Sequence, residues 1–134
     1  MNKIHKFKDK PILIGGRAME FYGLRKSHDY DFIISKRDGQ ALLKKYEPFD
    51  FPPVTPGFKF EKSKNKEFDF FTSMYHFDYD FFRKNAIKHK NFYVISKPDL
   101  IFLKSMTAYD PEAGPKRVIT KSLKDIQLLV KSLI

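Results

Sequence analysis

The chain has 134 residues, of which 42% are hydrophobic and none is cysteine, and it carries a formal net charge of +10. This size and composition predict one folded domain spanning residues 1–134 and exclude a disordered tail, disulfides and cysteine-ligated zinc. The sequence contains no apolar run of about 18 residues, so we expect no membrane span. The basic N-terminus lacks the apolar core of a secretory signal, and we therefore expect a cytoplasmic protein.

The predicted elements of the first half are a buried strand at 11–14, a helix at 17–22 closed by Gly23, a strand at 28–34, a turn at 37–39 and a helix at 40–46. Four prolines then predict an irregular connection: Pro48, Pro52, Pro53 and Pro56.

The second half begins with a predicted hairpin, in which apolar alternation at 58–60 and 68–71 flanks the polar segment 62–66. It continues with a helix at 80–87, a strand at 91–95, a helix entered through Ser96 and Pro98, a loop at 110–115 and a final helix. That final helix carries apolar residues at helical spacing: Leu123, Ile126, Leu129, Val130 and Leu133. The expected fold is α/β (α+β), with a small mixed β-sheet flanked by helices.

Two carboxylates, Asp29 and Asp31, precede the apolar run Phe32–Ile34 and are separated by one residue. On a strand they project from the same side, about 6–7 Å apart. Like charges this close are unfavourable unless a cation lies between them or one keeps its proton. Hard oxygen ligands favour Mg²⁺, which proteins bind together with substrate phosphates. The alternative is an ordinary half-exposed strand in which acidic and apolar residues alternate.

A third acid, Asp69, lies in the aromatic segment Phe68–Phe71. Burying an unpaired carboxylate is costly, so Asp69 either faces solvent or joins a charged site. Glu67 shares its face and competes for that role. Between the first strand and helix, Gly15 and Gly16 let the backbone approach a ligand closely, and a helix N-terminus offers free N–H groups to an anion. The same pair also fits a plain tight turn, and the ending typical of a P-loop is absent.

Three segments together resemble the nucleotidyltransferase superfamily that includes DNA polymerase beta: Ile14–Ala18 (Ile-Gly-Gly-Arg-Ala), Gly23–Asp31 (Gly-Leu-Arg-Lys-Ser-His-Asp-Tyr-Asp) and Phe68–Phe70 (Phe-Asp-Phe). The later segments Val94–Lys104 and Lys124–Leu129 resemble the tail of small bacterial nucleotidyltransferases, including toxins of abortive-infection toxin–antitoxin pairs. The resemblance covers roughly residues 11–130. The separate C-terminal domain of the larger toxins has no counterpart in it.

The resemblance implies a polymerase beta-like fold and a Mg²⁺-dependent enzyme, with Mn²⁺ as the alternative metal. The implied metal ligands and catalytic residues are Asp29, Asp31 and Asp69, the last as general base. The implied nucleotide-binding residues are Gly15, Gly16, Arg25, Ser27, Lys104 and Asp125. Without the resemblance, Lys104 fits a solvated lysine, and Asp125 fits a surface pair with Lys121 or Lys124.

The implied reaction transfers NMP from an NTP such as ATP to an acceptor hydroxyl. An RNA acceptor, tRNA-like, is favoured by lysines around 59–66, 84–90 and 116–124, although a lysine-rich proteome explains the same charge. A hydroxyl on a partner protein is the second acceptor. The chain is then a toxin with a cognate antitoxin, or an antitoxin-like enzyme that modifies a partner toxin. The alternative from a different class of function is a catalytically silent binding module of the same fold.

Overall fold

The computed structural model describes residues 4–51, 54–62, 66–110 and 116–134. The strands are β1 (Ile12–Ile14), β2 (Tyr30–Ile33), β3 (Phe49–Phe51), β4 (Val54–Lys62), β5 (Lys66–Phe71), β6 (Ser73–Met74), β7 (Phe77–Asp78), β8 (Ile87–Lys88) and β9 (Tyr93–Val94). The helices are α1 (Gly15–Phe21), α2 (Lys36–Leu43), α3 (Tyr79–Arg83), α4 (Lys97–Tyr109) and α5 (Lys116–Leu133).

Most strands join one mixed sheet, whose order within the described residues is β3-β4-β5-β2-β1-β9-β8, while β6 and β7 pair separately. The pairs β1–β9 and β2–β5 are parallel. The pairs β1–β2, β3–β4, β4–β5 and β8–β9 are antiparallel. A mixed sheet combined with helices confirms the predicted α/β (α+β) class.

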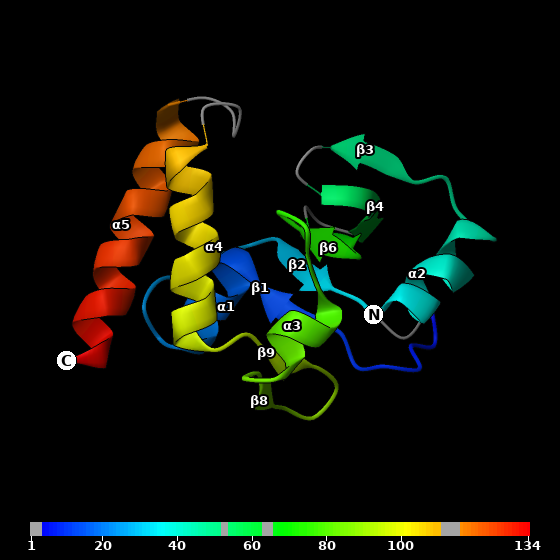
Figure 1. Ribbon diagram of the computed structural model, residues 1–134, viewed down its shortest axis with the longest axis horizontal. Helices are drawn as coiled ribbons and strands as arrows, with labels where there is room; N and C mark the ends of the chain where they lie inside the picture. Colours follow the sequence, from blue (N-terminus) through cyan, green and yellow to red (C-terminus); the bar gives the residue numbers. More distant parts are fainter. Residues whose placement is uncertain (1–3, 52–53, 63–65, 111–115) are drawn as a thin grey trace.

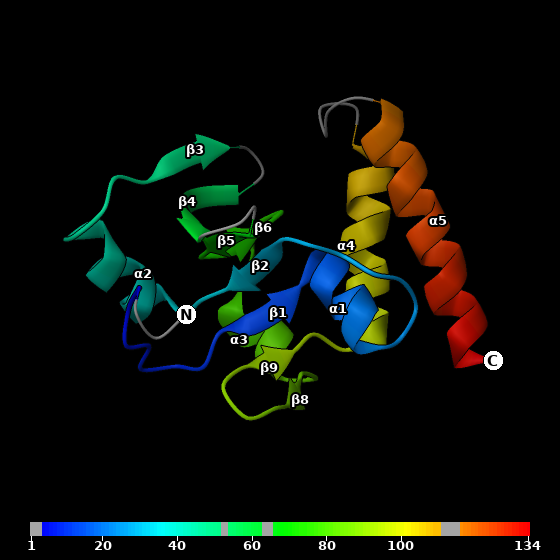
Figure 2. The same cartoon turned by 180° about the vertical axis from the view of Figure 1, so that it is seen from behind.

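Helices α4 and α5 pack against each other at one end of the molecule, and α1 lies between this pair and the sheet (Figure 1). The view from behind shows α2 at the other end, near β3 and β4 (Figure 2). Leu100 and Leu103 of α4 and Leu129 of α5 are buried in the same core as the central strands. The pair of helices is therefore attached to the sheet through apolar contacts.

Strands β2 and β5 run parallel in register, and this sorts their side chains into two faces. Phe32 stacks on Phe70 on one face, with ring centroids 5.5 Å apart, and both are buried. Because side chains alternate along a strand, Asp31 and Asp69 project from the opposite face. The aromatic face forms core, which leaves the acidic face for the candidate site.

The turn predicted at 37–39 is wrong, because these residues lie in the first turns of α2. Ser35 caps this helix: its Oγ accepts a hydrogen bond from the backbone N–H of Asp38. A Ser followed three residues later by an acid is typical of a helix start, and that signal outweighs the turn preference of Asp-Gly. The helix predicted at 40–46 therefore begins at Lys36 and ends at Leu43.

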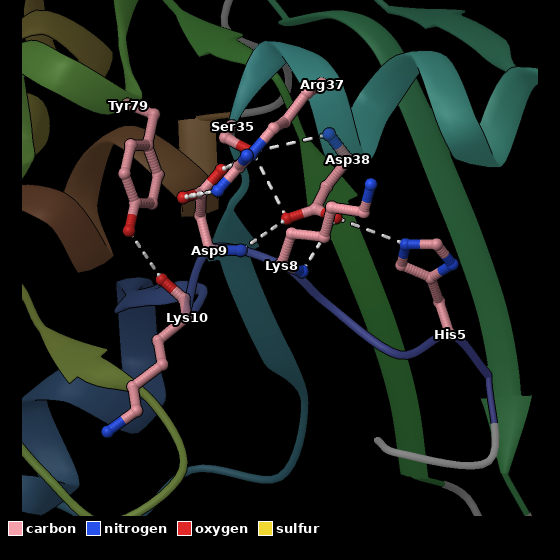
Figure 3. Close-up of polar contacts among 8 residues, drawn as sticks. All are labelled: His5, Lys8, Asp9, Lys10, Ser35, Arg37, Asp38 and Tyr79. Carbon is pink, nitrogen blue, oxygen red and sulfur yellow. Dashed lines mark hydrogen bonds and ion pairs between the residues drawn. The ribbon is translucent and has the colours of Figure 1, made fainter.

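Asp38 also holds the N-terminal segment against α2 (Figure 3). Its buried carboxylate accepts hydrogen bonds from the backbone N–H groups of Lys8 and Asp9, at 3.0 and 2.9 Å, and from Ser35 Oγ at 3.1 Å. His5 Nε2 lies 3.2 Å from the same carboxylate. This buried acid thus makes several of the contacts that hold the segment before β1.

The irregular connection predicted after Pro48 is wrong for residues 49–51, which form β3, and for residues 54–57, which lie in β4. Residues 52–53 lie outside the described residues. The register shifts between the pairs Phe49–Gly57 and Phe51–Val54, and Pro56 lies in this interval. Proline is tolerated at such irregularities because no ladder hydrogen bond is needed there.

Several other predicted elements are present with altered bounds. The hairpin of β4 and β5 is confirmed, although residues 63–65 lie outside the described residues. The helix predicted at 80–87 ends earlier, at Arg83, and β8 begins at Ile87. Of the loop predicted at 110–115, only Asp110 is described.

The final helix is confirmed, but its buried face differs from the predicted one. Leu129 is buried, whereas Leu123, Val130 and Leu133 are exposed. The polar side chains Ser122 and Asp125 take inward positions instead. In the described part of the chain, no helix combines the length and apolar character needed to cross a bilayer.

Candidate functional site

Asp31 and Asp69 are directly opposite each other on the parallel strands β2 and β5. Neighbouring strands lie about 4.8 Å apart, so the two carboxyl groups meet on one face of the sheet. Asp29 precedes β2, is exposed and contributes its negative charge to the surroundings of Asp31. The structure thus brings the second and third predicted acids together and leaves the first at their edge.

The two paired acids are buried close together, and the cations near them only partly offset the cost of their negative charge. Burial and then the charge of Asp69 raise the pKa of Asp31 to about 7, although the nearby Lys104 opposes the rise. Burial also raises the pKa of Asp69, against the lowering effect of Lys59. The buried Oδ1 of Asp69 has no hydrogen-bond donor among the described residues. A bound cation or a shared proton would relieve this arrangement.

The two glycines place the main chain beside these groups. α1 begins at Gly15, without the predicted turn, and Gly15 has a positive φ of 65°. A Cβ at Gly15 would lie 2.9 Å from Asp31 Oδ2, and one at Gly16 would lie 2.3 Å from Ser27 Oγ. The missing side chain thus makes room for Asp31 at Gly15 and for Ser27 at Gly16.

A second cluster joins α4, α5 and the segment after α1 around Asp125, whose side chain is only 1% exposed. Arg25 donates to both oxygens of Asp125, through Nε at 2.7 Å and Nη2 at 2.8 Å. Lys104 Nζ lies 2.9 Å from Oδ2. The alternative prediction, a surface pair of Asp125 with Lys121 or Lys124, is wrong. The side chain of Asp125 points inward to Arg25 and Lys104.

The electrostatics of Asp125 agree with this geometry. Burial alone would raise the pKa of Asp125, but the hydrogen bond from Arg25 and the charge of Lys104 outweigh burial and lower it. Both carboxylate oxygens are occupied by cations. Asp125 therefore orients Arg25 and Lys104.

Lys104 connects the two clusters, because it pairs with Asp125 and its charge also acts on Asp31. The site therefore consists of paired acids on the sheet, two cations beside them and a glycine pair next to both. The predicted residues that meet here are Gly15, Gly16, Arg25, Ser27, Asp31, Asp69, Lys104 and Asp125.

Lys59 is a site residue that the sequence reasoning missed. It is directly opposite Asp69 on β4, and its Nζ lies 3.5 Å from Asp69 Oδ2 and 3.3 Å from Glu67 Oε2. Glu67 and Asp69 share a face, as predicted. The hairpin register would have revealed Lys59, because the residue opposite a strand acid is often its ion partner.

Among the described residues, no three acidic or histidine side chains are grouped as a metal site. The three-acid metal site stays a prediction. Comparison with protein-family models, curated proteins and solved structures found no match.

Proposed function

We propose that this chain is a Mg²⁺-dependent nucleotidyltransferase that transfers NMP from an NTP to an acceptor hydroxyl. The observation that carries the proposal is the pairing of Asp31 with Asp69 on adjacent strands, with Lys104 close to both this pair and Asp125. Nucleotidyl transfer depends mainly on positioning and on neutralising phosphate charge, and paired acids beside cations offer the groups for both.

The paired acids fit a hard divalent cation. Asp31 and Asp69 would hold Mg²⁺, with Asp29 as the third ligand, because a buried carboxylate oxygen lacks a donor and the pKa of Asp31 is raised to about 7. Mn²⁺ accepts similar oxygen ligands. When bound, the ion would supply positive charge to the triphosphate and lower the pKa of the attacking hydroxyl.

The chain's own residues would carry the remaining roles. Arg25 and Lys104 bind triphosphate oxygens, and Asp125 keeps both cations in place. The acceptor oxygen forms a bond to the α-phosphorus, the bond from that phosphorus to the bridging oxygen breaks, and pyrophosphate leaves. Asp69 takes the proton of the acceptor hydroxyl, and its raised pKa suits a base.

In the direct test, purified protein is incubated with Mg²⁺ and each α-labelled NTP in turn. Either RNA or cell protein is added as the acceptor. We expect label in one acceptor, and we expect Asp31→Asn to abolish it. Asp80→Asn is the matched control, because Asp80 is an exposed acid on α3 outside the site. Activity that survives Asp31→Asn contradicts the proposed site. Wild type that labels no acceptor contradicts the proposed reaction and favours the alternative, a catalytically silent binding module.

The resemblance to abortive-infection toxins adds a cognate antitoxin or toxin partner to the proposal. Its test is expression of the chain with and without the genes that flank it. Growth arrest that depends on Asp31 and is relieved by a neighbouring gene supports a toxin. Unchanged growth contradicts that role without affecting the chemistry.

A further inference from the structure

We propose that the exposed basic face of α5 is a docking surface for the backbone of a single-stranded nucleic acid. Four exposed cations from the first half of the helix form this surface, which we call the α5 basic face: Lys116, Arg117, Lys121 and Lys124. Together with Thr120 they border an open hollow of about 450 Å³.

The α5 basic face has no counter-charge within the described residues. The one acid in α5, Asp125, points inward and is bound to Arg25 and Lys104. None of the four cations forms an ion pair with another described side chain. An isolated positive surface of this kind attracts a polyanion, because each phosphate that it neutralises releases a bound counterion.

The spacing of the cations suits a chain of phosphates better than one small anion. Arg117, Lys121 and Lys124 follow the i, i+4, i+7 pattern and therefore lie in one row along the helix. The row is about 10 Å long at 1.5 Å per residue. That length allows contacts with successive phosphates of one strand.

The α5 basic face lies close to the candidate site. Lys124 directly precedes Asp125, whose carboxylate binds Lys104, and the charge of Lys104 acts on Asp31. A nucleic-acid strand bound along α5 therefore runs beside the cluster around Asp125. The role of this strand as the acceptor rests on the proposed function, whereas its binding to α5 does not.

The test measures binding of a fluorescently labelled, unstructured 20-nucleotide RNA by anisotropy, without NTP or metal and across a salt series. The variant is Arg117→Gln/Lys121→Gln/Lys124→Gln. The matched control, Lys36→Gln/Lys44→Gln/Lys45→Gln, removes three exposed lysines of α2 and its C-terminal end and changes the net charge equally. Thermal melting checks that both variants fold.

For single strands the salt slope is about 0.7 per phosphate contact, so loss of three contacts lowers it by about 2. We expect roughly 100-fold weaker binding of the α5 variant at 0.1 M salt, and a change below about threefold in the control. If both variants bind RNA equally more weakly than wild type, the inference is overturned. It is also overturned if wild type binds anionic phosphatidylglycerol vesicles but not RNA.

The outcome separates this inference from the proposed function. If wild type binds RNA through α5 but transfers no nucleotide to any acceptor, the docking surface stands and the nucleotidyltransferase proposal fails. If label is transferred to a protein hydroxyl and RNA does not bind, the proposed chemistry stands and the docking surface is wrong.

Discussion

Gly16 faces Ser27 so closely that a Cβ at position 16 would lie 2.3 Å from Ser27 Oγ and 2.9 Å from Ser27 Cβ. Gly16 lies inside α1, where alanine would otherwise be preferred by about 1 kcal/mol. The close contact with Ser27, and not helix propensity, therefore accounts for glycine at this position. The space beside it is occupied by the loop that leads to the acids.

This contact makes Gly16→Ala sensitive to its neighbour. In the wild-type background we expect the substitution to destabilise the fold by about 1–3 kcal/mol, because the added methyl displaces Ser27. In a Ser27→Gly background the same change becomes neutral or stabilising, because the contact with Ser27 is gone and the remaining close atom, Arg25 Nη1 at 3.3 Å, ends a flexible side chain. Urea unfolding of the four proteins in this cycle measures the coupling. Equal cost in both backgrounds would show that the contact with Ser27 does not require the glycine.

The raised pKa of Asp31 makes the metal-free protein less stable as pH increases. The folded-state pKa of about 7 lies above the ordinary value of 3.8, so the folded state binds the proton more tightly. Protonated Asp31 therefore adds to the free energy of unfolding, fully below about pH 4, and this contribution disappears as pH rises through 7. The total loss is at most about 4 kcal/mol. Asp31→Asn should flatten this dependence and stabilise the protein at pH 8. A wild type whose stability stays constant between pH 5 and pH 8 in EDTA would contradict it.

Added Mg²⁺ should act in the same pH range, because metal and proton compete for the same carboxylates. We expect the melting temperature to rise with millimolar Mg²⁺ at pH 8 and to change little at pH 5. Asp31→Asn removes the effect, while Asp80→Asn retains it. Differential scanning fluorimetry with and without EDTA measures the shift. Identical shifts in the two variants would place the metal elsewhere.

Asp125 should matter for stability as well as for the site. Asp125→Asn leaves Arg25 and Lys104 without their anion, and their side chains are only 21% and 16% exposed. We expect a loss of about 2–3 kcal/mol at pH 7, below the cost of a fully buried pair because both cations retain some solvent. Because the pKa of Asp125 is lowered, its stabilisation begins to be lost as pH falls below about 4 and is gone once pH is below that lowered pKa, where the variant and wild type should converge. A cost that does not shrink at acid pH would point to packing instead.

The N-terminal segment gives a prediction that is independent of function. Asp38→Asn removes the charge that attracts donors from Lys8, Asp9 and Ser35, and we expect a loss of about 2–3 kcal/mol. Amide exchange at Lys8 and Asp9 should accelerate. Asp9→Asn is the control, because its partner Arg37 is 62% exposed and such pairs contribute about 1 kcal/mol or less. Similar costs for the two variants would contradict a special role for Asp38.

Local patterns in the sequence predicted much of the fold. The apolar run before Gly15, the capped entry at Ser96 and the alternation around Asp69 each predicted an element that the structure contains. These patterns are readable because they reflect burial and hydrogen bonding within a few residues. The errors at 37–39 and around Pro56 arose where a capping pattern and a register shift outweighed turn and proline preferences.

The residue types of the candidate site could also be proposed from sequence, but not their arrangement. Asp29 and Asp31 are separated by one residue in the chain, yet Asp31 is paired with Asp69, since β2 and β5 run parallel in register. No local pattern specifies that register.

Asp125 shows the same limit. An acid beside lysines on an amphipathic helix predicts a surface pair, but the packing of α5 on α4 turns it inward to Arg25, 100 residues away in the chain. The sequence by itself determined most of the elements, the glycine pair and the list of charged candidates, because these follow from short-range chemistry. Only the tertiary structure decided which charges meet and which face of α5 stays open, because those depend on contacts between segments that are distant in the chain.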